Sequence, residues 1–134
     1  MPIKYTIIEG KKLVLAVGQG LINFDDLARH IDTLAHDPKY ISPMKKLVDY
    51  RNASLVELKR EEAYMFTQKK AQLKDKFANE MCAIITKNDL DFGTSRVHGA
   101  RIEASDIHTN VFRNIKDALK WLEVELDETD LHLD

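Results

Sequence analysis

Short apolar runs alternate with longer amphipathic stretches along the chain. Five apolar runs have the length of β-strands, and they span residues 4–8, 13–17, 46–50, 81–86 and 109–112. The first two are joined by a polar connection that contains Gly10, which predicts an antiparallel hairpin. The run at 81–86 is apolar on both faces, a pattern typical of a central parallel strand.

Four amphipathic stretches repeat their apolar residues at helical spacing, and they begin at Asn23, Leu55, about Asp89 and Asn114. Asn23 and Asn114 are suitable N-caps, because an asparagine side chain accepts a hydrogen bond from the first helical turn. Ser54, followed three residues later by Glu57, predicts a capping box for the longest helix, residues 55–78. In that helix one apolar face is predicted to contain Leu55, Leu58, Met65, Phe66, Leu73 and Phe77.

The order of these elements predicts the fold class. A hairpin followed by regular alternation of helix and strand is typical of an α/β domain with right-handed crossovers. We therefore expect one domain, residues 1–125, with a five-stranded, mostly parallel mixed sheet and about four packing helices. Residues 126–134 are expected to form an acidic tail.

Composition narrows the class of protein. The chain has 134 residues, a formal net charge of −2 and a single cysteine, Cys82, which lies in an apolar run. This charge gives no general attraction to nucleic acid, and a lone buried thiol suits the reducing cytoplasm. The sequence shows no signal peptide and no apolar run long enough to span a bilayer.

Catalytic signatures are absent from the sequence. It contains no GxSxG, HExxH, P-loop or paired CxxC motif. His30 and His36 have no third ligand nearby in the sequence, so we interpret them as solvated side chains. We expect no enzymatic activity, no catalytic residue, no cofactor and no metal.

Polar side chains follow the parallel strands where each strand ends. Asp49, Arg51 and Asn52 close the third strand, whereas Lys87 and Arg113 follow the fourth and fifth. The carboxyl ends of parallel strands gather ligands in α/β domains, so these residues are candidates for a ligand site. Within this set, Arg51, Lys87 and Arg113 are candidates for attracting an anion. Asp49 and Arg51 are also explained as an ion pair that orders the chain after the strand.

The helix predicted at 55–78 has two charged residues near its apolar face, Glu62 and Lys69. Either they lie at its margin with their stems covering apolar surface, or they line the mouth of a cavity under a loosely packed helix. Phe92, which falls off the buried face of the next helix, is a further candidate for ligand contact. The basic, amphipathic end of this helix is also a candidate for contact with anionic lipid. The residues assigned to that membrane surface are Lys70, Leu73, Lys74, Phe77 and Ile102.

Three segments resemble a known family: LVDYR at the end of the third strand, AIITKNDLDFG across the fourth, and NVFRNIKDALKWL near the end. They are similar to small bacterial SpoIIAA-like proteins, relatives of STAS domains whose shape is akin to Sec14-type (CRAL-TRIO) lipid carriers. The resemblance implies a binding domain for a hydrophobic ligand, a lipid or a membrane surface, in the cytoplasm or at the inner membrane face.

The same resemblance leaves an alternative open. Anti-sigma factor antagonists of this fold regulate a protein partner through a phosphorylated Ser or Thr after the third strand. Here Ser54 is the only hydroxyl in that turn and helix start, and its position favours a cap over a phosphoacceptor. Whether the chain binds a protein partner or forms a homo-oligomer stays open.

Overall fold

The computed structural model describes residues 2–87 and 108–126. Within them a five-stranded sheet has the order β1-β2-β3-β4-β5, so that every strand lies beside its neighbour in the sequence. β1 and β2 are antiparallel, and the remaining pairs are parallel, which confirms the predicted fold class. The strands are β1 (Ile3–Ile8), β2 (Leu13–Leu21), β3 (Lys45–Ser54), β4 (Met81–Ile85) and β5 (His108–Phe112).

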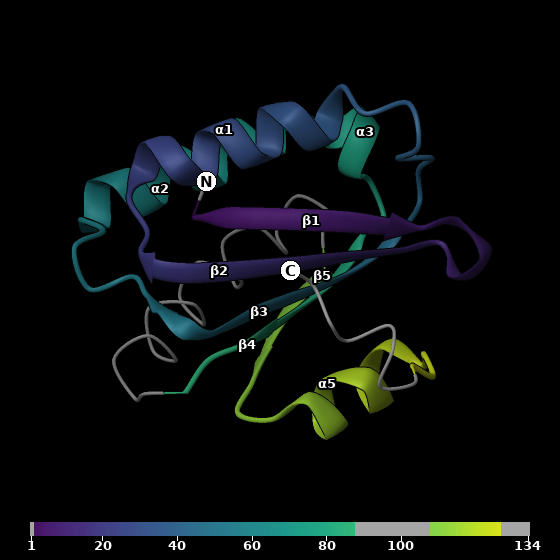
Figure 1. Ribbon diagram of the computed structural model, residues 1–134. Helices are drawn as coiled ribbons and strands as arrows, with labels where there is room; N and C mark the ends of the chain where they lie inside the picture. The colour runs from purple at the N-terminus through teal and green to yellow at the C-terminus, as the bar shows by residue number, and fades with distance from the viewer. Residues whose placement is uncertain (1, 88–107, 127–134) are drawn as a thin grey trace.

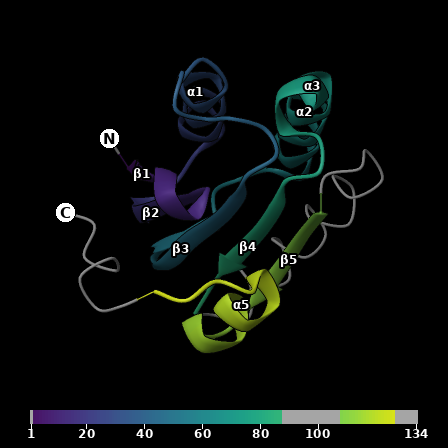
Figure 2. The ribbon, with the colours of Figure 1, turned by 90° about the vertical axis from the view of Figure 1, so that its right-hand side faces the viewer.

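Helices cover both faces of the sheet (Figures 1 and 2). On one face lie α1 (Phe24–Ala35), α2 (Arg60–Gln72) and α3 (Lys74–Phe77), whereas α5 (Ile115–Leu122) lies on the other. Two buried apolar clusters follow from this arrangement. The larger one lies under α1 and α2, and the smaller one lies under α5.

Both asparagine caps are confirmed. The Asn23 side chain accepts a hydrogen bond from the Asp26 backbone N–H at 2.9 Å, and the Asp26 carboxylate accepts one from the Asn23 N–H at 3.0 Å. Asn114 Oδ1 accepts from the Asp117 N–H at 2.9 Å. Such reciprocal bonds satisfy N–H groups that a helix start leaves without an intrahelical partner.

The predicted start of the long helix is wrong. β3 continues to Ser54 because β2 continues to Leu21, which provides residues 52–54 with a parallel partner strand. The Ser54 hydroxyl accepts a hydrogen bond from the Val56 N–H at 3.1 Å and caps no helix. The helix begins at Arg60, where the Glu62 carboxylate accepts from the Lys59 N–H at 3.0 Å.

The long helix is also interrupted at Leu73, which separates α2 from α3. Most of its predicted apolar face is buried or partly buried, but Met65 is half exposed. The helix predicted at 89–104, with Phe92 and Ile102, lies outside the described residues. No helix in the described ranges is long and apolar enough to cross a membrane.

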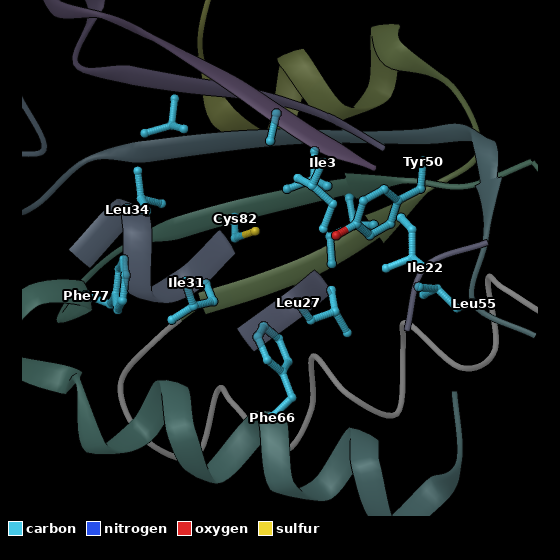
Figure 3. Packing of buried hydrophobic residues seen from close by; sticks show 14 of the residues in the cluster. Ile3, Ile22, Leu27, Ile31, Leu34, Tyr50, Leu55, Phe66, Phe77 and Cys82 are labelled. Carbon is cyan, nitrogen blue, oxygen red and sulfur yellow. The ribbon is translucent and has the colours of Figure 1, made fainter. Parts of the chain in front are cut away.

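One glycine is required by close packing. A Cβ atom added to the buried Gly18 would lie 2.7 Å from side-chain atoms of both Ile22 and Tyr50. Tyr50 points into the larger cluster (Figure 3), so Gly18 lets this ring lie against the backbone of β2. Gly10, by contrast, has open space around it.

Candidate functional site

A cavity of about 50 Å³ lies between the sheet, α1 and α2. We call it the chamber. Figure 3 shows Leu27 and Ile31 of α1 and Phe66 of α2 on the helix side of this space, with Cys82 and Tyr50 on the sheet side. The described lining is mostly apolar, but it also includes five side chains with polar nitrogen or oxygen atoms, namely His30, Lys46, Tyr50, Lys70 and Thr109.

The floor of the chamber follows from strand alternation and register. Lys46 of β3 pairs with Cys82 of β4, and Cys82 pairs with Thr109 of β5, so the three lie in one row across the sheet. The next row on the same face consists of Val48, Ile84 and Val111. Successive side chains of a strand point to opposite faces, so these two rows lie on the same face of the sheet. The row of Lys46, Cys82 and Thr109 is polar, and the row of Val48, Ile84 and Val111 is apolar.

Two cationic side chains meet over this floor. Lys46, only 3% exposed, has its Nζ 2.6 Å from Nε2 of the buried His30 on α1. Lys70 of α2 is also 3% exposed, and its Nζ donates to Glu80 Oε1 at 2.7 Å. The other Glu80 oxygen accepts from the Tyr40 hydroxyl at 2.6 Å. Glu80 itself is fully buried just before β4.

The protonation states follow from this geometry. Burial, together with the charges of Lys46 and Lys70, lowers the pKa of His30 well below its usual value, so its ring is neutral and accepts the Lys46 N–H. Burial raises the pKa of Glu80, but the Lys70 and Lys46 ammonium groups outweigh this and lower it. Burial also lowers the pKa of Lys70, and the charge of Glu80 outweighs it and raises that pKa.

Lys46 differs from Lys70 because no carboxylate is bonded to it in the described residues. Burial, reinforced by the charge of Lys70, lowers its pKa from 10.5 to about 8. Cys82 beside it has a raised pKa, because burial disfavours the thiolate. The thiol is free and buried, as the sequence predicts.

The chamber reaches the surface near Leu58. Of its described lining residues, Leu58 is the one that is not buried. Val56, two residues earlier, and Leu21, which pairs with the neighbouring Ser54, are each more than half exposed.

The residues predicted at the carboxyl end of the sheet do not line the chamber. Asp49 and Arg51 lie on the α5 face, near Leu47 and Ile115. They form the predicted ion pair, with Arg51 Nε and Nη2 donating to the two Asp49 oxygens at 2.9 and 2.8 Å. Burial raises the pKa of Asp49, but these bonds outweigh it and hold the pKa low. The three further residues predicted for this ligand site, Asn52, Lys87 and Arg113, are exposed.

Glu62 and Lys69 are also absent from the described lining of the chamber. Glu62 accepts from the Lys59 N–H at the helix start, and Lys69 forms a 3.0 Å ion pair with Asp32 of α1. Their roles are therefore to cap α2 and to join it to α1. The hypothesis that Glu62 and Lys69 line the mouth of the cavity is therefore wrong for the residues that the structure describes.

The predicted membrane surface needs correction. Lys70 and Phe77 are buried, with Phe77 packed edge-on against Tyr40, so neither can contact a lipid surface in this conformation. Leu73 is partly buried against the larger cluster. The side chain of Lys74 lies outside the description, as does Ile102. The helical periodicity correctly grouped Leu73 and Phe77, but the face these two residues share is turned toward the core.

Sequence reasoning missed the polar groups of the chamber. His30 was interpreted as solvated, yet it is 7% exposed. One signal was available: Lys46, Val48 and Tyr50 alternate along one strand face, so a lysine occupies a position expected to be apolar. For Glu80 and Thr109 no comparable signal exists, since their burial depends on how α3 and β5 dock.

Comparison with known proteins agrees with this architecture. The crystal structure of an uncharacterised protein of the DUF3478 family from Shewanella loihica PV-4, described as having a SpoIIAA-like fold, is similar to this chain with a TM-score of 0.60. The two share 18% identity over 90% of this chain and 93% of that one. No protein-family model and no curated protein matches the chain. The chain has a SpoIIAA-like fold, and at this identity the likeness concerns the fold alone.

Proposed function

We propose that the protein is a non-enzymatic binding domain for a small hydrophobic molecule, which it holds in the chamber between the sheet, α1 and α2. The observation that carries the proposal is the chamber itself, a mostly apolar cavity between the sheet and the two helices. Binding pockets for small molecules are typically apolar with a few placed polar groups, and this lining has that composition.

The polar groups of the chamber support binding over catalysis. Lys70, Glu80 and Tyr40 are engaged with one another, and His30 is engaged with Lys46. A general base must reach the proton that it removes, and in this arrangement the imidazole nitrogen facing Lys46 is already occupied. We therefore assign these groups to positioning a ligand and to fixing the packing of α1 and α2.

The size of the chamber limits what it accepts without rearrangement. Its volume of about 50 Å³ is well below the roughly 300–1,000 Å³ of pockets for drug-sized ligands. A head group and a few carbon atoms fit, and a longer chain must leave past Leu58. Membrane insertion through α3 is a weaker alternative, because Phe77 is buried.

The test is a titration of isotope-labelled protein with octan-1-ol, followed by backbone amide chemical shifts. We expect saturable shifts in β3, β4, α1 and α2. Leu58→Trp should block the opening and weaken binding, whereas Met65→Trp, on the exposed side of α2, should leave it unchanged. Equal effects of the two variants would contradict the proposal. Absence of saturable shifts up to the solubility limit, with octan-1-ol and also with its carboxylate analogue octanoate, would contradict it too.

A further inference from the structure

The chamber contains an imbalance of charge. The ionised side chains that face one another around Lys46 are Lys70, whose pKa is raised, and Glu80, whose pKa is lowered, so two ammonium groups share one carboxylate. His30 is neutral and Cys82 keeps its thiol proton. Below the pKa of Lys46, the described part of this buried region therefore carries one excess positive charge.

A buried charge without a counter-ion is costly. Proteins either pair such a group or shift its pKa until it loses its charge. The Lys46 ammonium donates to a neutral imidazole, which satisfies one N–H without balancing the charge. An anion entering the chamber would supply the missing partner.

A second, independent observation points to a polar ligand atom. Thr109 of β5 lines the chamber and is 8% exposed, and its buried hydroxyl has no hydrogen-bond partner in the described part of the chain. Buried hydroxyl groups are normally hydrogen-bonded, and leaving one without a partner costs free energy. A polar atom held in the row of Lys46, Cys82 and Thr109 would satisfy it.

From these two observations we infer that the ligand of the chamber is a monocarboxylate amphiphile, whose carboxylate pairs with Lys46 and whose apolar body lies against Leu27, Phe66 and Leu58. This inference rests on the proposed function and specifies its ligand class. A single negative charge balances the excess, whereas a phosphate monoester, which approaches two charges at neutral pH, would leave an excess of the opposite sign. The limited volume also favours the smaller head group.

The experiment compares three ligands with the same chain and different heads: octanoate, octan-1-ol and octylamine. Affinities are measured by chemical-shift titration at pH 7 and low salt for wild type, Lys46→Met and Lys45→Met. Lys45 is a matched control, because it neighbours Lys46 but its side chain bonds to the Leu122 carbonyl at the α5 face. Wild type is expected to bind octanoate at least about tenfold more tightly than octan-1-ol, and octylamine least tightly, as for a partly desolvated ion pair.

In Lys46→Met the ratio of the affinities for octanoate and octan-1-ol should be close to one, and in Lys45→Met it should be the same as in wild type. A second measurement uses wild type alone, in case the variant is unfolded. As pH rises above about 8, Lys46 of the free protein loses its proton, so octanoate binding should weaken while octan-1-ol binding stays constant. Lys70, Glu80, His30 and Cys82 are the other titratable groups facing Lys46, and a neutral ligand controls for their effect on the chamber.

The outcomes separate the two proposals. Octan-1-ol binding as tightly as octanoate, or a preference for octanoate that survives Lys46→Met, would overturn the inference and leave the binding function standing. Failure of both ligands to bind would overturn both. Tightest binding of octylamine would show that the excess charge has the opposite sign to the one assigned.

Discussion

Replacing Lys46 by Met should stabilise the empty protein at neutral pH and destabilise it at high pH. The substitution keeps a side chain of similar length and removes a charge that is buried without a carboxylate partner. The pKa of Lys46 falls from 10.5 to about 8 on folding, and at about 1.36 kcal/mol per pKa unit this corresponds to a cost of about 3 kcal/mol for keeping the ammonium in the folded state.

The pH window follows from the direction of the shift. Between pH 8 and 10.5 the unfolded state holds a proton that the folded state has released, so the stability of wild type rises with pH in this range. The stability of Lys46→Met does not depend on pH in this way, because the variant has no ammonium group. It does leave His30 Nε2 without its hydrogen bond, and this lowers the free energy of unfolding by about 1 kcal/mol. Lys46→Met should therefore be about 2 kcal/mol more stable than wild type at pH 6.5, and this advantage should disappear near pH 9.5.

Urea denaturation followed by circular dichroism, at pH 6.5, 8 and 9.5, measures these free energies. The protein is first unfolded and dialysed, which removes any bound molecule, and Lys45→Met serves as the control for loss of a lysine. A difference between wild type and Lys46→Met that stays constant across this pH range would refute the reasoning. It would mean that Lys46 keeps its proton, as it would beside a fixed counter-ion.

Two further predictions concern stability. Lys70→Met should lower the free energy of unfolding by about 3–5 kcal/mol, because it leaves the Glu80 carboxylate buried without its partner. The double variant Lys70→Met/Glu80→Leu should recover much of this loss. Additive effects of the two substitutions, measured from urea midpoints in a double-mutant cycle, would contradict the pairing. Gly18→Ala should lower the free energy of unfolding by about 1–3 kcal/mol or more, because the new methyl group meets the Tyr50 ring. Gly10→Ala, which has open space around it, should leave the stability close to that of wild type. Equal melting temperatures for the two variants would contradict this packing.

Local patterns predicted much of the fold. The strand runs, the hairpin, and the caps at Asn23 and Asn114 follow from alternation and side-chain chemistry, which act over a few residues. The boundary at Ser54 was wrong because it depends on a distant segment. β3 continues there only because β2 runs beside it, and no local signal reports the length of a partner strand.

The candidate site was harder to predict from the sequence than the fold was. Helical periodicity placed Leu73 and Phe77 on one face, but it does not say whether that face meets the core or the solvent. A lysine can be buried when a carboxylate from another element reaches it, as Glu80 does here across ten positions. Such pairing is a tertiary property. The one local sign of the chamber was Lys46, at an inward position of an apolar strand.

The sequential order of the five strands bears on how the chain assembles. Each strand pairs with the one before it, so the sheet can grow in the order of synthesis without inserting a strand between two that are already paired. Glu80 reaches Lys70 and Tyr40 only when β4 docks. Before β4 docks, the side chains of Lys70 and Tyr40 are expected to stay hydrated. During that time α2 should be only loosely attached to the rest of the domain. Docking of the fourth strand should therefore be the step that fixes α2 to the sheet, and the chamber is complete only when β5 brings Thr109 beside Cys82.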